Sequence, residues 1–570
     1  MKMKTNKTIS KLVSSAILAM TTLAPSFAQT NLGAACGCPS VASRPTVLVS
    51  TLATSGGASD GELTASNTIF DCAHTYILDK KIYVPNGKTL TINAGALIKG
   101  RFNADASLAT ALTVEVGGKI FASGNADCQI VFTAEADPLD GTYAISNKGQ
   151  WGGLLLAGKA SNNLTLAANG PFQAGVGDGR LCVADGIGTF EGFASTNGKD
   201  QFGVAPASFD DNDNSGVLKY VSVRHAGAAL QVGGEINGIS FGSVGRGTTV
   251  DHVEVISCAD DNMEFWGGTV NIKYATFLFG NDDMFDWDDA YNGKAQFIFG
   301  MKSDNAATSP SADADNGFEM DSDDQKSNAT LHAHPIIFNA TMIGNNKAAL
   351  TSDNSGLAAI EAKELTEGEI SNSVFANFRY GVNVIKALGT RTGASESYHN
   401  WANTGGNSTN SLKIKCNTFV GMTKDFAIDK NAAGGSVVGG VITGGVATTD
   451  TAQFYTTDKN KSVASIAGFD YAFAVNNATN AISHKVDAVP NPALATTGCP
   501  TAPVDGFFTA AAYRGAFAPT GKNWMSDWTY ATILSVTPGL APCPADLNQD
   551  GVTNVTDFLQ VLGQYNQSCN

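Results

Sequence analysis

Several features are scarce in this 570-residue sequence, and each scarcity excludes a class of protein. After an apolar run at 12–23, no segment is long and apolar enough to cross a bilayer as a helix, so we do not expect a membrane-spanning protein. The ten cysteines include no Cys-x-x-Cys pair, which argues against a zinc site. Between residues 60 and 430, strong apolar patterns at helical spacing are also missing, which argues against a helical fold.

Positive charge is scarce as well. Lys and Arg number 36 against 52 Asp and Glu, which gives a formal net charge of −16. Such a surface repels phosphate backbones and anionic lipids, so we expect neither nucleic acid nor anionic membranes as partners. Ser and His residues are too scattered to indicate a catalytic triad, and the glycine-rich runs lack the context of a phosphate loop.

Residues 1–28 have the features of a secretory signal peptide. Four lysines and the apolar run precede the small residues Ser26 and Ala28, which predict cleavage before Gln29. An even number of cysteines also suits an oxidising destination. We therefore expect a secreted or cell-surface protein. Acylation of Cys36, as in a lipoprotein, is the alternative, although the residues before it depart from the usual motif.

Short strand patterns recur between residues 61 and 430. Apolar residues stand mainly at alternate positions, and Gly, Asn or a polar turn follows. The spacing suits stacked coils of about 22 residues with some longer turns. We predict an all-β fold, a right-handed parallel β-helix with capped ends; a β-sandwich array or a propeller is the alternative. The clearest patterns are at 218–223, 250–255, 272–277, 337–342, 370–375 and 414–419.

The segments on either side of the predicted β-helix differ from it in composition. Residues 29–60 are expected to form an irregular N-terminal cap before the β-helix of 61–430. Residues 431–535 lose the clear repeat and end in a group of aromatic residues, so we expect terminal coils and an aromatic cap over the last coil. A linker at 536–542 then leads to a small module at 543–570.

This final module contains the pattern of a calcium loop, D-x-N-x-D-G-x-x-N-x-x-D. Oxygen-bearing side chains stand at loop positions 1, 3, 5, 9 and 12, position 7 offers its carbonyl, and glycine permits the turn at position 6. Position 12 is Asp, whereas an ordinary EF-hand has Glu. Cys543 and Cys569 flank the loop, and we expect a disulfide between them because so small a module builds little core. The expected calcium ligands are Asp546, Asn548, Asp550, Val552, Asn554 and Asp557.

The calcium loop and the short apolar helix predicted after it resemble one half of a dockerin type I repeat. A dockerin has two such loops, whereas this chain has one. The resemblance implies calcium as the bound ion and a cohesin-like or sorting partner. We expect the module to attach or sort the protein.

A second acidic region lies inside the predicted β-helix. Residues 259–324 contain fifteen acidic residues and three lysines, and the acids recur after successive strands. Equivalent turns of a β-helix stack about 4.8 Å apart, where two carboxylates repel each other by about 1 kcal/mol even in water. Bound calcium would offset this repulsion; a solvated acidic surface is the alternative. The calcium candidates here are Asp286, Asp288, Asp289, Glu319, Asp321 and Asp323.

Three further stretches are 83–92 (YVPNGKTLTI), 149–154 (GQWGGL) and 513–517 (YRGAF), the last followed by Asn523 and Trp524. They resemble a family of secreted bacterial β-helix proteins with a pectin-lyase-like fold, which are often lipoproteins. The resemblance covers most of the mature chain. It implies a fold and a location, and it implies no catalytic residues.

Enzymes that cleave polysaccharides also use the parallel β-helix. Lyases combine calcium-binding acids with a base, and hydrolases use grouped Asp residues as acid and base. Asp282, Asp283 and Asp286 are the candidates for catalysis here, but the acidic region has no Arg and its lysines show no recognised spacing. The nearby basic residues, which we interpret as surface or turn residues, are Arg224, His225, Arg246 and His252.

These patterns predict a secreted, calcium-binding β-helix protein. Its expected role is attachment to a cell surface or binding of a polysaccharide. The alternative is a polysaccharide lyase or a glycoside hydrolase of the same fold.

Overall fold

The structure is a computed structural model, and it describes most residues between 29 and 533. The predicted signal peptide, the linker and the C-terminal calcium module lie outside the described residues, as does Asp323. The described ranges are 29–54, 60–166, 182–192, 198–230, 234, 236–303, 316–322, 331–345, 358–385, 397–402, 411–428, 436–438, 441–443, 448–466, 469–471, 474–476, 481–484, 494–520, 523–526 and 528–533.

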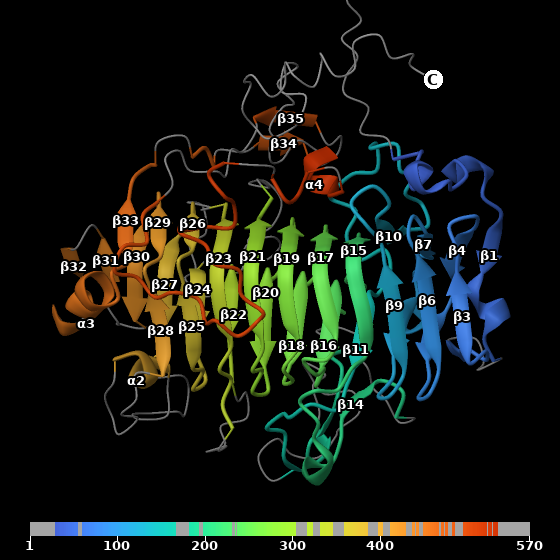
Figure 1. Cartoon of the computed structure of the whole chain (residues 1–570), viewed down its shortest axis with the longest axis horizontal. Coiled ribbons are helices and arrows are strands. Elements are labelled where there is room, and N and C mark those ends of the chain that lie inside the picture. The colour runs from blue at the N-terminus through green and yellow to red at the C-terminus, as the bar shows by residue number, and fades with distance from the viewer. Residues whose placement is uncertain are drawn as a thin grey trace, which may run out of the picture.

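Successive coils of the chain stack side by side and contribute strands to two long sheets (Figure 1). The thirteen-stranded sheet contains its strands in chain order. Its neighbours pair in parallel as far as β30, and the last two pairings are antiparallel. Its strands are β2 (Asp60–Glu62), β5 (Lys81–Val84), β8 (Ala111–Val114), β11 (Leu154–Ala157), β16 (Ile239–Gly242), β18 (Met263–Trp266), β20 (Phe285–Asp288), β22 (Phe318–Met320), β24 (Ala358–Ala362), β27 (Tyr380–Val384), β30 (Lys424–Ile428), β31 (Ser436–Val438) and β32 (Val441–Thr443).

The seventeen-stranded sheet bends into two faces, so each coil has three sides. Long strands run through both faces in the middle of the chain: β15 (Gly216–Arg224), β17 (Thr249–Ile256), β19 (Asn271–Leu278), β21 (Lys294–Met301) and β23 (Ile336–Ile343). Elsewhere each face has its own short strands. The first face has β3 (Asn67–Phe70), β6 (Thr89–Asn93), β9 (Lys119–Ser123), β25 (Gly368–Ser371) and β28 (Leu412–Lys415). The second has β1 (Thr46–Leu48), β4 (Thr75–Leu78), β7 (Leu97–Gly100), β10 (Ile130–Ala134), β26 (Val374–Ala376), β29 (Thr418–Val420) and β33 (Lys461–Val463).

One residue in the left-handed conformation makes the bend in each long strand. Such a backbone costs an ordinary residue about 1 kcal/mol or more. Ring stacking along this corner offsets the cost: Tyr220, His252 and Tyr274 stack with centroids 4.4 Å apart, and Phe297 follows 5.1 Å from Tyr274. The corner residues are Tyr220, His252, Tyr274, Phe297 and Asn339, with φ between 50° and 59°.

The predicted strand patterns are confirmed, with one correction. The patterns at 370–375 and 414–419 each contain two strands, because Asn372 and Cys416 have positive φ and turn the chain between them. The apolar residues of these patterns therefore point inward from two different faces.

The space between the faces is filled by one continuous hydrophobic core. Alternate side chains of the thirteen-stranded sheet enter it, as Phe265, Trp287 and Met320 do from three successive coils. All three are fully buried. Complete burial of such side chains contributes roughly 1.5–3 kcal/mol each, which makes this core the main stabilising element of the solenoid.

Short elements cover parts of the coils. A small antiparallel sheet of β12 (Cys182–Ala184), β13 (Ile187–Thr189) and β14 (Gln201–Gly203) packs Phe202 against the outward Trp266, with ring centroids 6.0 Å apart. At the C-terminal end, α3 (Thr448–Ala452) and a π-helix (Gln453–Thr457) place Phe454 in the core. The remaining short elements are α2 (Ser397–Ala402), α4 (Tyr530–Ile533), β34 (Ala474–Asn476), β35 (Ala481–His484) and the 3-10 helices Ala34–Cys36, Val41–Ser43, Val49–Leu52, Ala106–Leu108 and Pro206–Ser208.

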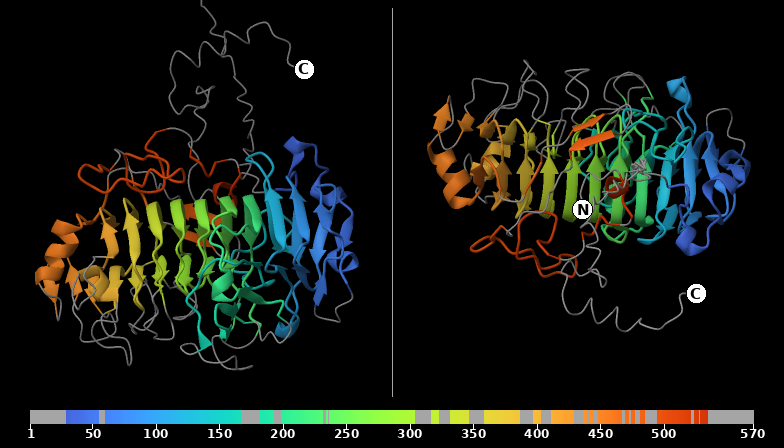
Figure 2. Two further views of the ribbon diagram at one scale, coloured as in Figure 1. Left: turned by 60° about the horizontal axis from the view of Figure 1, so that its bottom comes forward. Right: turned by 90° about the horizontal axis from the view of Figure 1, so that it is seen from above.

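The aromatic segment near the C-terminus differs from the expected end cap. Residues 494–520, 523–526 and 528–533, here called the C-terminal strap, lie along the side of the solenoid (Figure 2, red). The second face presents apolar residues outward, among them Leu278 and Phe299, and the strap covers them with Phe517 and Met525. The last coil is covered instead by the helices around Phe454. The cap therefore comes from an earlier part of the chain than we expected.

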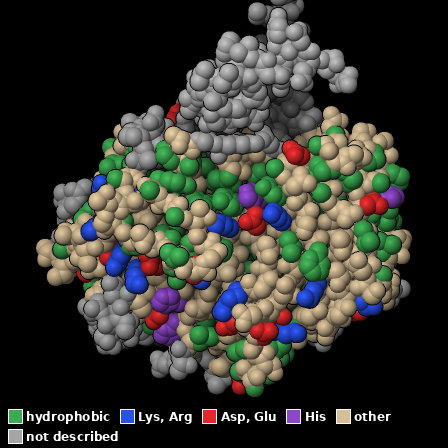
Figure 3. All heavy atoms as spheres, in the orientation of Figure 1, with side chains coloured by type: hydrophobic (Ala, Val, Ile, Leu, Met, Phe, Trp, Pro, Cys, Tyr) green, Lys and Arg blue, Asp and Glu red, His purple; other side chains and the backbone are tan. Residues whose placement is uncertain are grey.

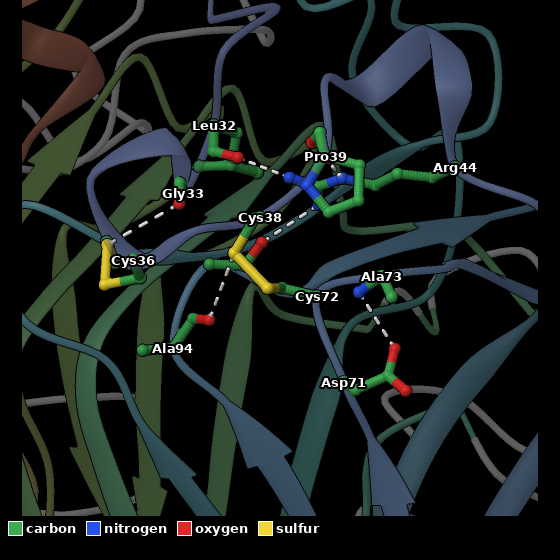
Figure 4. The surroundings of a disulfide bond; sticks show 12 residues. Leu32, Gly33, Cys36, Cys38, Pro39, Arg44, Asp71, Cys72, Ala73 and Ala94 are labelled. Atoms are coloured by element: carbon green, nitrogen blue, oxygen red, sulfur yellow. Dashed lines mark hydrogen bonds between the residues drawn. A yellow bond between two sulfur atoms is a disulfide. The ribbon is translucent and has the colours of Figure 1, made fainter.

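In the part of the chain that the structure describes, three disulfides fasten the ends of the solenoid, and they join Cys36 to Cys128, Cys38 to Cys72, and Cys416 to Cys499. Figure 4 shows the N-terminal pair of bridges beside Arg44, which donates to the carbonyl oxygens of Leu32 and Pro39 in its own segment and of Gly95 from a neighbouring coil. Because the sulfur of Cys36 is in a disulfide, it is not available for acylation. Disulfides are consistent with an extracellular protein. Cys182 and Cys258 are buried thiols.

The described residues contain no helix long and apolar enough to cross a membrane. On the face drawn in Figure 3, acidic and basic side chains are interspersed and neither forms a broad patch. Of the acidic residues that the sequence singles out, Asp282 and Asp283 lie in the turn before β20, whereas Asp286 and Glu319 lie within the strands β20 and β22.

Candidate functional site

Polar side chains form a ladder two positions before the strands β16, β18, β20 and β22. The oxygen of Asn237 accepts the backbone N–H of Asp261 at 3.1 Å, and Asp261 accepts that of Asp283 at 2.7 Å. Asp283 in turn accepts the N–H of Asn316, and Asn316 accepts that of Ala358 at 3.1 Å. This turn ladder satisfies one buried donor in each coil, so two of the acids have an architectural role.

A second ladder of acids runs along the outward side of the sheet. Parallel register places Glu264 beside Asp286, Asp286 beside Glu319, and Glu319 beside Glu361. The intervening residues of these strands point into the core, so the acids follow from the two-residue alternation of a strand. Glu264 and Asp286 are 4% and 9% exposed, so this ladder is not an ordinary solvated surface.

The two ladders meet in a cluster of seven carboxylates. Within each of three overlapping groups, oxygens of the three residues lie within 4.8 Å of one another. Oxygens bound to one calcium ion at about 2.4 Å can be at most about 4.8 Å apart, so each group matches the reach of one ion. The groups are Asp260, Asp261 and Asp282; Asp261, Glu264 and Asp286; and Asp283, Asp286 and Glu319. These seven residues are called the acidic cluster.

The cluster is electrostatically unfavourable without a counterion. Burial raises the pKa of Asp261 well above its ordinary value, and the charges of Asp286, Asp282, Asp260 and Glu264 raise it further. A cation with several oxygen ligands would relieve both effects, because it favours the ionised form of every acid around it.

Lys363 neutralises one side of the cluster. Its ammonium group pairs with Glu319 and lies 3.1 Å from Asp321. Burial opposes the charged form of this lysine, but Asp321, Glu319 and Glu361 outweigh that effect and raise its pKa well above the ordinary value. Lys363 therefore remains protonated, which suits an ion-pair partner and not a catalytic base.

Two other lysines reach the turn at Asn281 and Asp282. Lys302 donates to the carbonyl oxygen of Asp282, and Lys148 donates to the side-chain oxygen of Asn281. Lys302 is 2% exposed, so it lies beneath the turn. Sequence reasoning missed Lys148 and Lys363, because they are far from the acidic region in the chain. It also missed Asn237 and Asn316, although their position two residues before a strand is a signal that could have found them.

The structure separates the predicted site residues into two sets. Asp282, Asp283, Asp286 and Glu319 belong to the acidic cluster. The other described candidates lie outside its three groups: Asp321 pairs with Lys363, and Asp288 accepts the backbone N–H of Asp289 at 2.9 Å. Those that lie outside the described residues are Asp323 and the predicted calcium loop with Asp546, Asn548, Asp550, Val552, Asn554, Asp557, Cys543 and Cys569.

The interpretation of the nearby basic residues as surface or turn residues is wrong for Arg224, which is buried within β15; His225 is also buried but lies at the bend that follows this strand. Arg224 and His225 are each 1% exposed. Arg224 lies over the ring of Tyr530 at 4.3 Å, and the imidazole of His225 contacts the carbonyl of Asn147 at 2.7 Å. Burial lowers the pKa of His225 to about 4, so its ring is neutral at ordinary pH. Both lie under the strap and loop segments that cover the second face, which the sequence pattern did not reveal.

Comparison with known proteins supports the architecture. No curated protein matches the chain. The family model of the pectate-lyase-like β-helix domain matches residues 61–468. Together with the parallel sheets, this match supports right-handed winding of the coils. Because the match covers more than half of the sequence, the chain belongs to the pectate-lyase-like β-helix family.

Proposed function

We propose that this protein binds polysaccharide in a calcium-dependent way and works in attachment at a cell surface. The observation that carries the proposal is the acidic cluster, in which three groups of carboxylates each match the reach of one calcium ion. The family fold supports a role connected with polysaccharides. A secreted location, predicted from the leader, would supply calcium at the concentrations that extracellular sites use.

Accessibility within the cluster favours binding. Asp261 and Asp283 are buried and already accept backbone N–H groups in the turn ladder. Asp260, Asp282 and Glu319 are partly exposed and form its outer edge. An ion held between the two sets would present its open coordination positions outward, where carboxylate or hydroxyl oxygens of a glycan could complete the shell. Calcium would also screen the repulsion that a polyanionic glycan meets at these acids.

Polysaccharide cleavage is the second candidate function, and one observation favours it. Asp261 has a strongly raised pKa and lies within reach of Asp282 and Asp286. A protonated carboxyl beside ionised ones is the arrangement that glycoside hydrolases use as acid and base. Asp282, Asp283 and Asp286 remain the candidates for that chemistry.

Calcium titration of the full-length protein tests the proposal. Isothermal titration should show binding at the acidic cluster that is lost in Asp286→Asn and retained in Asp200→Asn. Asp200 is a suitable control because it is also a buried acid, 4% exposed, which accepts the hydroxyl of Tyr83 at 2.7 Å. Asp550→Asn would remove the separate contribution of the predicted C-terminal loop.

Glycan binding is then measured with immobilised neutral and polyuronate polysaccharides, with calcium and with EDTA. We expect retention only with calcium, no release of sugar, and loss of retention in Asp286→Asn. New reducing ends or unsaturated ends that disappear in Asp282→Asn, Asp283→Asn or Asp286→Asn would support the enzyme instead. No retention and no products across the panel would contradict both candidates.

A further inference from the structure

A cavity of about 250 Å³ lies between the C-terminal strap and the last strands of the second face. β29 and β33 line one side of it, and the strap lines another. None of the residues that line it belongs to the acidic cluster, so it is separate from the proposed calcium site. Its walls include Thr418, Lys461, Val463, Ile466, Leu494 and Arg514.

Arg514 lines the buried side of this cavity and is 4% exposed. Its Nε atom donates to the carbonyl oxygen of Ala495 at 3.1 Å. One terminal nitrogen, Nη1, donates to the carbonyl oxygen of Asn417 and to the hydroxyl of Thr418, each at 3.2 Å. The other, Nη2, lies 3.4 Å from the sulfur of Cys499. Because a guanidinium group carries five N–H donors, one donor is left on Nη2.

The positive charge of Arg514 is not balanced, because all of these partners are neutral. Among the described residues, no carboxylate forms an ion pair with it. A buried charge without a partner of opposite sign is unfavourable, and an anion beside it offsets that cost. Lys461 adds a second positive charge at the rim: it is exposed on β33, and no acid in the described part of the chain pairs with it. The cavity therefore attracts an anion.

Apolar side chains limit which anion fits. Ile466 and Leu494 pack on the apolar cluster beneath the strap, and Val463 is 37% exposed at the opening. A cavity of about 150 Å³ between such side chains is large enough for benzene. The 250 Å³ of this cavity therefore accommodates one six-membered ring or a short alkyl chain together with a carboxylate. A sugar acid would lose water from its hydroxyl groups against these walls without gaining hydrogen bonds there.

We propose that this cavity binds a small organic carboxylate with an apolar body. The carboxylate accepts the remaining N–H of Arg514 and lies within the field of Lys461, and such charge-assisted hydrogen bonds are stronger than neutral ones. The apolar body packs against Ile466 and Leu494. This site needs no calcium, and it stands whether or not the proposed glycan binding holds.

Isothermal titration of the full-length protein in EDTA tests the site, because EDTA removes the contribution of any calcium site. The probes are benzoate, hexanoate, neutral benzamide and glucuronate. We expect one molecule of benzoate or hexanoate per chain, and the tighter of the two shows whether the natural ligand is aromatic or aliphatic. Benzamide and glucuronate should bind at least about 10-fold more weakly, because each lacks one of the two features that the cavity recognises. These comparisons use the unmutated protein, so they do not depend on the folding of a variant.

Substitutions then locate the bound carboxylate. Lys461→Gln should weaken binding by about 2- to 5-fold, as expected for an exposed charge, and Lys461→Arg should preserve it. Arg514→Gln should weaken binding by about 10- to 100-fold. Lys219→Gln is the matched control, since Lys219 is an exposed lysine of β15 that does not line the cavity, and its affinity should equal that of the wild type.

Several results would overturn the proposal. One is the absence of benzoate and hexanoate binding to the wild type. Another is binding of benzamide or glucuronate that is as tight as that of the apolar carboxylates. Because Arg514 also holds the strap, Arg514→Gln is informative only where its melting temperature matches that of the wild type, and Lys461→Gln carries the test otherwise. An affinity for benzoate that is unchanged in Lys461→Gln, or lowered equally in Lys219→Gln, would also contradict the site.

Discussion

Replacing Asp261 by Asn separates the charge of the acidic cluster from its shape. The side-chain oxygen of asparagine accepts a backbone N–H as the carboxylate does, and Asn237 and Asn316 already do so in the same turn ladder. The substitution therefore keeps the ladder and removes one negative charge. In the absence of calcium, we expect Asp261→Asn to be more stable than the wild type.

The expected gain in stability can be estimated from the distance between neighbouring carboxylates. Two unit charges 4.8 Å apart repel by about 0.9 kcal/mol at the dielectric constant of water and by about 3.5 kcal/mol at an effective value of 20. The raised pKa of Asp261 limits this cost, because the folded protein can relieve the repulsion by binding a proton. We expect a net gain of about 1–3 kcal/mol near pH 8. For a cooperative unit of roughly 400 residues this corresponds to about 1–4 °C in melting temperature.

The raised pKa of Asp261 also predicts the direction in which stability changes with pH. The folded pKa of Asp261 lies above its unfolded value, so the folded protein binds more protons between the two values. The stabilising contribution is therefore present at low pH and lost as the pH rises through the folded pKa. Wild-type protein in EDTA should lose stability over that interval, and Asp261→Asn should lose less.

Thermal unfolding with EDTA and with calcium provides the measurement. Calcium at 100 times its dissociation constant should stabilise the wild type by about 2.7 kcal/mol and Asp261→Asn by less. Asp200→Asn controls for loss of any buried acid. The reasoning would be refuted if Asp261→Asn melted lower than the wild type in EDTA, or if Asp200→Asn shifted the melting temperature as much.

Three further predictions concern the packing around the second face. Cys499→Ser should loosen the strap and lower the stability of the protein by up to about 4 kcal/mol, because the bridge to Cys416 closes a separation of 83 residues. Unchanged protease cleavage within 494–533 would contradict this prediction. Glu254→Gln should also weaken the attachment of the strap, lowering the free energy of its detachment by about 1–3 kcal/mol, because the buried carboxylate accepts the N–H groups of Tyr530 and Ala531 at 2.9 and 3.0 Å. Equal rates of proteolysis in this variant and the wild type would argue against it. His225→Gln should reduce the loss of stability as the pH falls from about 6.5 to about 4. The folded pKa of this histidine is about 4, so protonation at low pH favours the unfolded chain in the wild type. If the melting temperature of the variant depends on pH as that of the wild type does, the prediction is refuted.

Local patterns in the sequence predicted the coils but not their corners. Alternating apolar residues identified the strands around Val250 and Ile272, because each coil repeats one inward face. Nothing in Tyr220, His252 or Phe297 marks a left-handed backbone, since the cost of that conformation is offset only when the rings of adjacent coils stack. The strap was misplaced for a related reason: aromatic composition shows that a segment must be covered, but not which surface covers it.

The candidate site could likewise be predicted from the sequence only in part. A spacing of 22 residues brings Asp261 to Asp283 and Glu264 to Asp286, so the sequence could predict that these acids stack. Glu319 joins them from 33 positions after Asp286, because a longer turn precedes its strand. Lys148 arrives from a coil far earlier in the chain, and only the register of the folded sheets shows which turn it meets.

The turn ladder also indicates which charges the fold does not need. Each rung needs one oxygen acceptor, and Asn237 and Asn316 supply it with neutral side chains. At the two middle rungs the chain carries Asp261 and Asp283 instead, and it adds Glu264 and Asp286 beside them. Repulsion among these acids opposes folding, while packing and hydrogen bonding would be served equally well by amides. The negative charge is therefore an addition to the architecture, and a bound cation is the simplest physical reason for a sequence to keep it.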